Sequence, residues 1–160
     1  IITALDAGVR GEVTIVATNR LEIIVEAGNP RSITSLADLA RPGLDVVLAA
    51  PEVPAGKYAR VVLERAGVVV SPRSFESNVK AVVTKVALGE ADAGIVYATD
   101  VMAVGEQAAG IVIPADQNVV ASYGAAVPAG SRHAARAADF VRFLQSERAK
   151  EILQRYGFGT

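Results

Sequence analysis

The sequence predicts an α/β protein whose sheet is mainly parallel and carries helices on both faces. Ala and Val make up about a third of the 160 residues and aromatic residues only 5%, a balance typical of buried, Val-rich strands. Through the middle of the chain, strand-length apolar runs alternate with helix-length amphipathic segments, which is the pattern of successive βαβ units. With 51% apolar and 21% charged residues, the chain is expected to fold around a substantial core.

Two strands and a short helix are expected first. Residues 12–17 and 21–26 are rich in β-branched and apolar residues, and the polar residues 18–20 between them predict a turn. Ser35 and Asp38 have the spacing of a capping box, which predicts that a short helix begins there. That helix is expected to end at Pro42-Gly43, because neither residue continues a helix well.

A strand, a helix and a further strand are expected next. Residues 45–49 are apolar after the first position, which predicts a central strand buried on both faces. Apolar residues at helical spacing predict a helix over 55–66, and Gly67 suits the left-handed position that follows a helix. The valine run 68–70 predicts another strand.

The second half of the chain continues this alternation. Asn78 predicts the N-cap of a helix over 79–88, because its side chain can accept a hydrogen bond from the first turn. Gly89 ends that helix, and the apolar residues 93–97 predict another buried strand. The remaining expected elements are a short helix from about residue 99, strands at 110–113 and 119–127, and helices at 131–145 and 146–156.

Composition and missing motifs argue against several classes of protein. A net charge of −1 and a pI near 5.9 disfavour a nucleic-acid binder. The absence of Cys excludes disulfides, thiolate metal sites and a cysteine nucleophile. No nucleophile elbow, P-loop or zinc-binding pair of His is present, so an enzyme and a bound cofactor are not expected. His133, the single histidine, and Lys57 are expected to face solvent.

Two helix starts and one tyrosine are candidate anion-binding groups. Ala55-Gly56 opens the first long helix after a buried strand, and Val79 opens the second. Helix N-termini carry free N–H groups and a partial positive charge, so both can bind anions. Tyr97 ends a predicted strand and can present its hydroxyl to a ligand. From the residues alone, the favoured explanations of the same three positions are an ordinary turn, an ordinary capped helix and a half-buried ring.

Five segments resemble one family in order and in sequence. The chain is similar throughout to the periplasmic molybdate-binding proteins, the substrate-binding components of molybdate ABC importers. The most specific segments are PEVPAGKYA, GEADAGIVY and the terminal RYGF. The matching segments are ATNRLEIIV (17–25), SLADLARPG (35–43), PEVPAGKYARVVLERAG (51–67), GEADAGIVYATD (89–100) and ILQRYGFG (152–159).

The resemblance implies a type II periplasmic-binding-protein fold, in which two α/β lobes trap an oxyanion. Residues 22–118 would form the complete second lobe, and residues 1–21 with 119–160 part of the first. The rest of the first lobe would precede Ile1 and is expected to be missing. The resemblance also implies a periplasmic or extracytoplasmic location, with room for a lipid anchor ahead of Ile1, and an ABC permease as partner.

The resemblance implies a set of ligand contacts as well. The backbone amides of Ala55 and Val79 and the hydroxyl of Tyr97 would contact oxygens of molybdate or tungstate, without direct ligation of the metal atom. Hydroxyl contacts from the first lobe would lie in the missing segment, so this chain alone is expected to bind the oxyanion weakly or not at all unless that segment is supplied. Open strand edges at 12–17 and 119–127 predict self-association.

One alternative function remains open at this point. The same lobe architecture serves as the ligand-sensing domain of bacterial transcription regulators. Those proteins carry a helix-turn-helix ahead of the sensor, and no such motif occurs in these 160 residues. The segments PEVPAGKYA and RYGF favour the transport protein.

Overall fold

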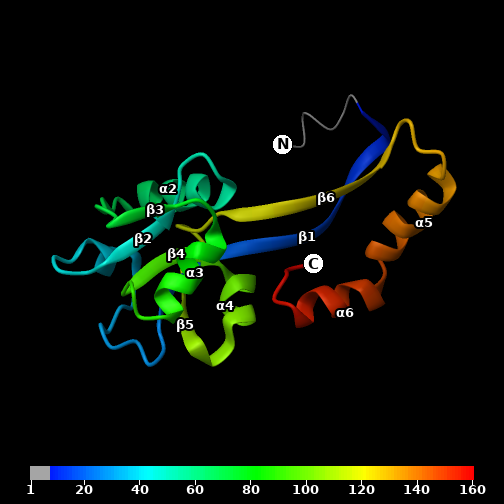
Figure 1. The fold of residues 1–160 in the computed structure, drawn as a ribbon. Helices are drawn as coiled ribbons and strands as arrows, with labels where there is room; N and C mark the ends of the chain where they lie inside the picture. The colour runs from blue at the N-terminus through cyan, green and yellow to red at the C-terminus, as the bar shows by residue number, and fades with distance from the viewer. Residues whose placement is uncertain (1–7) are drawn as a thin grey trace. The chain divides into compact units, whose positions relative to one another are not determined.

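The computed structural model describes residues 8–160, so residues 1–7 of the segment assigned above to the first lobe lie outside it (Figure 1). Six strands form one sheet in the order β3-β2-β4-β1-β5, and β6 pairs with β1. The elements are β1 (Val9–Glu26), the 3₁₀ helix η1 (Leu36–Ala40), β2 (Val46–Ala49), α2 (Pro54–Ala66), β3 (Ser74–Glu76), α3 (Val79–Ala87), β4 (Ala93–Tyr97), α4 (Ala98–Val104), the 3₁₀ helix η2 (Gly105–Gln107), β5 (Ala108–Val112), β6 (Val120–Pro128), α5 (Ala134–Leu144) and α6 (Glu147–Arg155).

The chain divides into two compact units. Unit 1 consists of Ile1–Asn19 and Ala121–Thr160, and unit 2 consists of Arg20–Val120. Both clusters of buried apolar side chains found among the described residues belong to unit 2. The assignment of residues 22–118 and of the two terminal segments to lobes of the family fold stays a prediction.

Four strands of unit 2 run in one direction. β2 pairs in parallel with β3 and with β4. β1 lies between β4 and β5 and is antiparallel to both, so β5 has the same direction as β4. The predicted mainly parallel sheet is therefore correct for β2 to β5. It is wrong for β1, which does not follow a crossover helix and is free to enter the sheet in the opposite direction.

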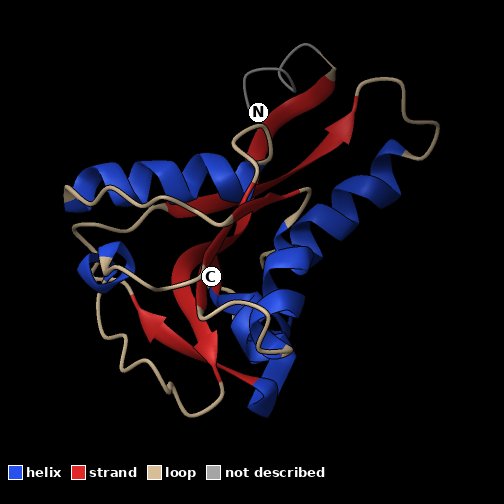
Figure 2. Ribbon diagram, turned by 60° about the vertical axis from the view of Figure 1, so that its left-hand side comes forward, coloured by secondary structure: helices blue, strands red, loops and turns tan. Residues whose placement is uncertain are grey.

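Side chains alternate between the two faces of this sheet. Val46 and Leu48 pack with residues of α2 and η1 in one apolar cluster. Val47 and Ala49 pack with residues of α3 in the other. Successive side chains of a strand point to opposite faces, so a strand that is apolar at every position needs a helix on each side. Helices thus cover both faces, as the sequence predicts (Figure 2).

The turn predicted at residues 18–20 is absent, because β1 continues without a break through these residues. The backbone N–H and C=O of Thr18 pair with the C=O and N–H of Gly159 at 2.7 and 2.9 Å. Leu21 then begins the pairing with β4 opposite Tyr97. A polar stretch without Gly or Pro can stay extended when the segments beside it make hydrogen bonds with its backbone N–H and C=O groups. Pairing with residues far away in the sequence therefore overrides the local turn signal.

The strand predicted at residues 68–70 is also absent. The N–H of Val68 donates to the carbonyl of Leu63 at 3.0 Å, as part of the end of α2. Gly67 adopts the left-handed conformation predicted for it, with φ of +66°. Val69 is 86% exposed, and the strand next to β2 is formed instead by β3, later in the chain. Residues 68–70, for which the valine run predicts a strand, therefore follow directly on the end of α2 and form no strand.

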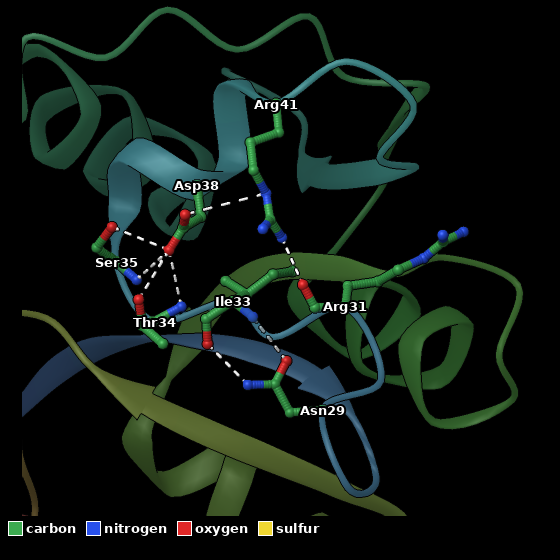
Figure 3. Close-up of polar contacts among 7 residues, drawn as sticks. All are labelled: Asn29, Arg31, Ile33, Thr34, Ser35, Asp38 and Arg41. Carbon is green, nitrogen blue, oxygen red and sulfur yellow. Dashed lines mark hydrogen bonds and ion pairs between the residues drawn. The ribbon is translucent and has the colours of Figure 1, made fainter.

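Side chains fix the loop between β1 and β2 (Figure 3). The Asn29 amide donates to the carbonyl of Ile33 at 2.7 Å and accepts from its N–H at 2.9 Å. The carboxylate of Asp38 accepts hydrogen bonds from the backbone and hydroxyl groups of Thr34 and Ser35. These bonds, those of Thr34 first, lower the pKa of Asp38 to about 2 against the opposing effect of burial. The predicted helix start at Ser35 is therefore confirmed.

Candidate functional site

Three helices of unit 2 begin at one edge of its sheet, here called the carboxyl edge. β2, β3 and β4 are parallel neighbours, and their last residues lead into α2, α3 and α4. The ends of β2 and β3 are level, because Ala49 and Glu76 are register partners. The carboxyl ends of parallel strands meet at one edge, so the amino termini of these helices lie there together. Such an edge is where open α/β sheets usually bind ligands.

The start of α2 presents backbone donors. Its first backbone hydrogen bond runs from the N–H of Lys57 to the carbonyl of Val53 at 3.0 Å. The N–H groups of Ala55 and Gly56 precede this bond, and neither donates to an acceptor within residues 8–160. Pro54 has no N–H and suits the first turn of a helix. Ala55 itself is buried, so its amide is held in place by packing.

Gly56 is required by the packing of α2 on β2. A Cβ at this position would lie 2.5 Å from the carbonyl oxygen of Ala49 and closer still to that of Ala50. The sequence pattern suggests that Ala55-Gly56 leaves the backbone open to a ligand. In the structure the missing side chain of Gly56 instead lets the helix approach the end of its own strand. This close approach fixes where the amides of the first turn lie.

The start of α3 has the predicted cap. Asn78 is extended, with φ of −159° and ψ of 166°, and its Oδ1 accepts from the N–H of Ala81 at 3.0 Å. The N–H groups of Val79 and Lys80 lie ahead of the capped amide in the same first turn. Val79 is half-buried, which leaves one side of this turn accessible. A second set of donors thus lies at the carboxyl edge.

Tyr97 joins β4 to α4. It is half-buried, pairs with Leu21 of β1, and packs its ring edge-on against Tyr58 with centroids 6.4 Å apart. Its N–H donates to Oδ2 of Asp100 at 3.1 Å, which caps α4. The backbone and the ring of Tyr97 are therefore fixed by separate contacts, and the position of its side chain is well determined.

Asp100 is the one acidic group among these helix starts that the sequence reasoning missed. Burial raises the pKa of its carboxyl, and the bond from the Tyr97 amide and the positive charge of Lys80 act in the opposite direction. Lys80 belongs to the first turn of α3, and the helices α3 and α4 contact each other. The available sequence signal is an acidic residue three positions after the helix cap.

The structure brings the three predicted residues together. Ala55 belongs to the apolar cluster that lies between the sheet and α3, and Val79 and Tyr97 pack against that same cluster. Lys57 and His133 are exposed, as expected, and His133 belongs to unit 1. Within residues 8–160, no three His, Cys, Asp or Glu side chains form a group that could hold a metal ion. No helix of that same range is long and apolar enough to cross a membrane.

A cavity of unit 2 lies at the opposite edge of the sheet. It encloses about 770 Å³ and is lined by residues that precede β2, β3 and β4, together with the end of α3. Charged pairs dominate it: Arg31 with Asp92 at 2.8 Å and Arg73 with Asp45 at 2.6 Å. Burial raises the pKa of Asp92, but the amide of Asp45 and the guanidinium of Arg31 outweigh burial and hold it below its usual value.

Comparisons with known proteins match nearly the whole chain. The model of the family described as bacterial extracellular solute-binding protein matches residues 2–159. The molybdate-binding protein ModA of Mycobacterium tuberculosis is 38% identical over 148 residues, which cover 92% of this chain. The match covers 57% of ModA, so this chain spans little more than half the length of that relative.

Solved structures share the fold. The substrate-binding domain of a putative molybdenum ABC transporter from Clostridium difficile has a TM-score of 0.81 and 25% identity, over 99% of this chain and 72% of that one. The periplasmic molybdate-binding protein of Azotobacter vinelandii has a TM-score of 0.79 and 18% identity, over 99% and 73%. These likenesses confirm the predicted α/β fold of periplasmic binding proteins. The chain belongs to the bacterial extracellular solute-binding proteins.

Proposed function

We propose that this chain binds a tetrahedral metal oxyanion, molybdate or tungstate, as part of the substrate-binding component of an ABC importer. The observation that carries the proposal is the meeting of two helix starts and Tyr97 at the carboxyl edge of unit 2. Two of the similar proteins described above are named for molybdate or molybdenum and share at least a quarter of their residues with this chain. They support the choice of ligand.

The proposed contacts use backbone and hydroxyl donors. The amides of Ala55 and Val79 and the hydroxyl of Tyr97 would donate to oxygens of the anion, and no protein atom would ligate the metal atom. The N–H of Ala55 precedes the hydrogen-bond ladder of α2, and that of Val79 lies in the first turn of α3 ahead of the capped amide. Each helix also places its positive dipole end at the ligand.

Donor-only sites suit this class of anion. Molybdate and tungstate carry two negative charges and offer only acceptors, so every oxygen can be satisfied by an N–H or O–H. Protonated phosphate carries a P–OH that needs an acceptor, and a donor-only site disfavours it. Sulfate has the same charge and the same acceptors, so only the size of the site can exclude it. Molybdate and tungstate are nearly equal in size and are expected to compete.

The same proposal covers location, partner and chemistry. An ABC permease is the expected partner and an extracytoplasmic space the expected location, because the family is one of extracellular solute-binding proteins. We propose binding without catalysis and without a cofactor, the anion itself being the cargo. The family model and the relatives described above are those of solute-binding and transport proteins, so the ligand-sensing domain of a regulator is not favoured.

The decisive experiment is an NMR titration of the ¹⁵N-labelled chain, because it reports weak binding at individual amides. Molybdate is added to millimolar concentration, with sulfate and phosphate as controls. Shifts centred on the amides of Ala55, Gly56, Val79 and Lys80 are expected with molybdate and tungstate. Shifts centred on Asp45 and Asp92, at the opposite edge, would contradict the proposal, whereas the absence of shifts with every anion is the result expected if binding needs donors beyond those of this chain.

A pair of tyrosine variants tests the hydroxyl. Tyr97→Phe removes one donor to a charged ligand, so we expect affinity to fall by about 1.5–3 kcal/mol, roughly 10- to 150-fold. Tyr156→Phe makes the same chemical change at a ring that is 68% exposed in unit 1, and it serves as the matched control. Equal affinities of the two variants would remove Tyr97 from the site.

A further inference from the structure

The chain passes between its two units twice, and one side chain of unit 2 connects the two passages. The first passage follows Asn19 and the second follows Val120. Leu21 lies just after the first, and Asn118 lies just before the second. Both residues belong to unit 2, and both are buried. Their contact therefore lies where two segments that are far apart in the sequence leave the unit.

The amide of Asn118 uses its full bonding capacity. Its Oδ1 accepts from the N–H of Leu21 at 3.1 Å and from the N–H of Val119 at 2.8 Å. Its Nδ2 donates to the carbonyl of Leu21 at 2.9 Å and to that of Ile113 at 3.3 Å. An asparagine amide has two donors and two acceptor positions, so none is left over. Asn118 is only 6% exposed, so water does not compete for these bonds.

Asn118 replaces a missing strand partner. The pairing of β1 with β5 reaches Glu22 and Val112, and the chain then turns away from the sheet. Leu21 would be the next residue of β1 in that ladder, and its N–H and C=O need partners because it is buried. The side chain of Asn118 supplies one acceptor and one donor, as the backbone of a paired strand residue would. The guanidinium of Arg65 in α2 also donates to the backbone carbonyl of Asn118.

We propose that Asn118 is a positioning residue that fixes both connecting segments where they leave unit 2, and so limits the motion of unit 1 against unit 2. The bonds hold Leu21 and Val119 to each other through one rigid amide, so the two passages cannot bend independently up to that point. Bending is then confined to the few residues around each unit boundary that lie beyond Leu21 and Val119. This inference is independent of the proposed ligand, since it concerns only the connection of the units.

The test measures the distance between the units without any ligand. The chain has no Cys, so two introduced cysteines carry spin labels at defined places. Glu64→Cys in α2 and Glu147→Cys in α6 suit this use, because their side chains are 62% and 85% exposed and lie in different units. Pulsed electron–electron double resonance then gives the distribution of distances between the labels.

Asn118→Asp is the informative variant, because a carboxylate keeps the acceptors and loses both donors. Asn29→Asp is the matched control: Asn29 makes the same two bonds to one residue, Ile33, but within a loop of unit 2 (Figure 3). We expect Asn118→Asp to broaden the distance distribution and Asn29→Asp to leave its width as in the parent chain. Equal broadening in both, or none in a folded Asn118→Asp, would overturn the proposal.

A second variant covers a failure to fold. Asn118→Gln keeps the amide but moves it outward by one methylene, so it should also broaden the distribution of distances between the labels. Circular dichroism establishes which variants are folded before the distances are compared. If neither Asn118 variant folds while Asn29→Asp does, the residue is needed for folding itself, and a specific role in limiting motion between the units is refuted.

Discussion

Gly56→Ala is the sharpest single test of how the carboxyl edge is built. Two effects oppose each other in this substitution. Alanine favours a helix over glycine by about 0.5–1 kcal/mol. Against this, the new Cβ would lie 2.5 Å from the carbonyl oxygen of Ala49 and closer to that of Ala50, whereas ordinary contacts begin at 3.4 Å. Both neighbours are backbone atoms at the end of a buried strand, so they cannot move away cheaply.

The clash outweighs the helix propensity and decides the sign of the change in the free energy of unfolding. Relieving it requires the start of α2 to move by about 1 Å, and overpacking of this kind typically costs about 1–3 kcal/mol. We therefore expect Gly56→Ala to lower the free energy of unfolding despite its better helix propensity. For a chain of this size each kcal/mol lowers Tm by about 2–4 °C. The same movement takes the amides of Ala55 and Gly56 out of hydrogen-bond range of a bound anion, at about 1.5–3 kcal/mol for each bond lost.

Gly130→Ala is the matched control. A Cβ at Gly130 meets no atom within 4 Å, and the backbone there is not left-handed. An alanine at such a site is expected to be neutral or to stabilise by about 0.4–1 kcal/mol, through the unfolded chain. Calorimetry of the two variants gives their Tm, and an anion titration gives their affinities. If Gly56→Ala melts at or above Gly130→Ala, the close approach of α2 to β2 does not govern this site.

Three further predictions follow from other contacts. Asn78→Ala removes the cap of α3 and should lower the free energy of unfolding by about 0.5–2 kcal/mol in thermal melts, whereas an unchanged Tm would show the cap to be dispensable. The pKa of Asp38 is lowered to about 2, so its contribution to stability is present above pH 4 and is lost as pH falls toward 2. The free energy of unfolding of the parent chain should therefore approach that of Asp38→Asn as pH falls over that range. Parallel stability curves of the two chains would contradict this. Phe140, Phe143 and Tyr156 of unit 1 are 60, 43 and 68% exposed, so sedimentation should detect self-association between micromolar and millimolar concentration, reduced by Phe140→Ser, and a monomer throughout would count against it.

Elements with local signals could be predicted from the sequence. The helix α3 begins at Asn78, whose side chain makes the predicted cap, and α2 is followed by a left-handed Gly67. The apolar strands β2 and β4 are buried where they were expected. These signals act within a few residues, so no knowledge of the rest of the chain is needed to interpret them. The candidate anion site depends on such signals, because helix starts are local features.

Features that depend on distant partners could not be predicted. β1 runs through residues 18–20 because Gly159, near the other end of the chain, pairs with Thr18. The valine run 68–70 looks like a strand, yet the position beside β2 is taken by β3. The role of Asn118 is visible only once Leu21 lies beside it, since 97 positions separate them. In each case a long-range hydrogen bond decides among conformations that the local sequence permits.

The two edges of the sheet in unit 2 differ in the kind of charge they offer, and this difference explains why a dianion is expected at the carboxyl edge and not in the cavity at the opposite edge. In that cavity Arg31 and Arg73 already face Asp92 and Asp45, so an incoming anion must separate an ion pair and lie beside carboxylates. At the carboxyl edge the amides of Ala55 and Gly56 in the first turn of α2 have no acceptor in the described chain, so an anion that binds to these two amides breaks no bond of theirs. Asp100 is the opposing charge, and burial raises its pKa, which lessens its repulsion as pH falls. Under the proposed function, fixed amide dipoles, rather than a lysine or arginine, would therefore provide the attraction.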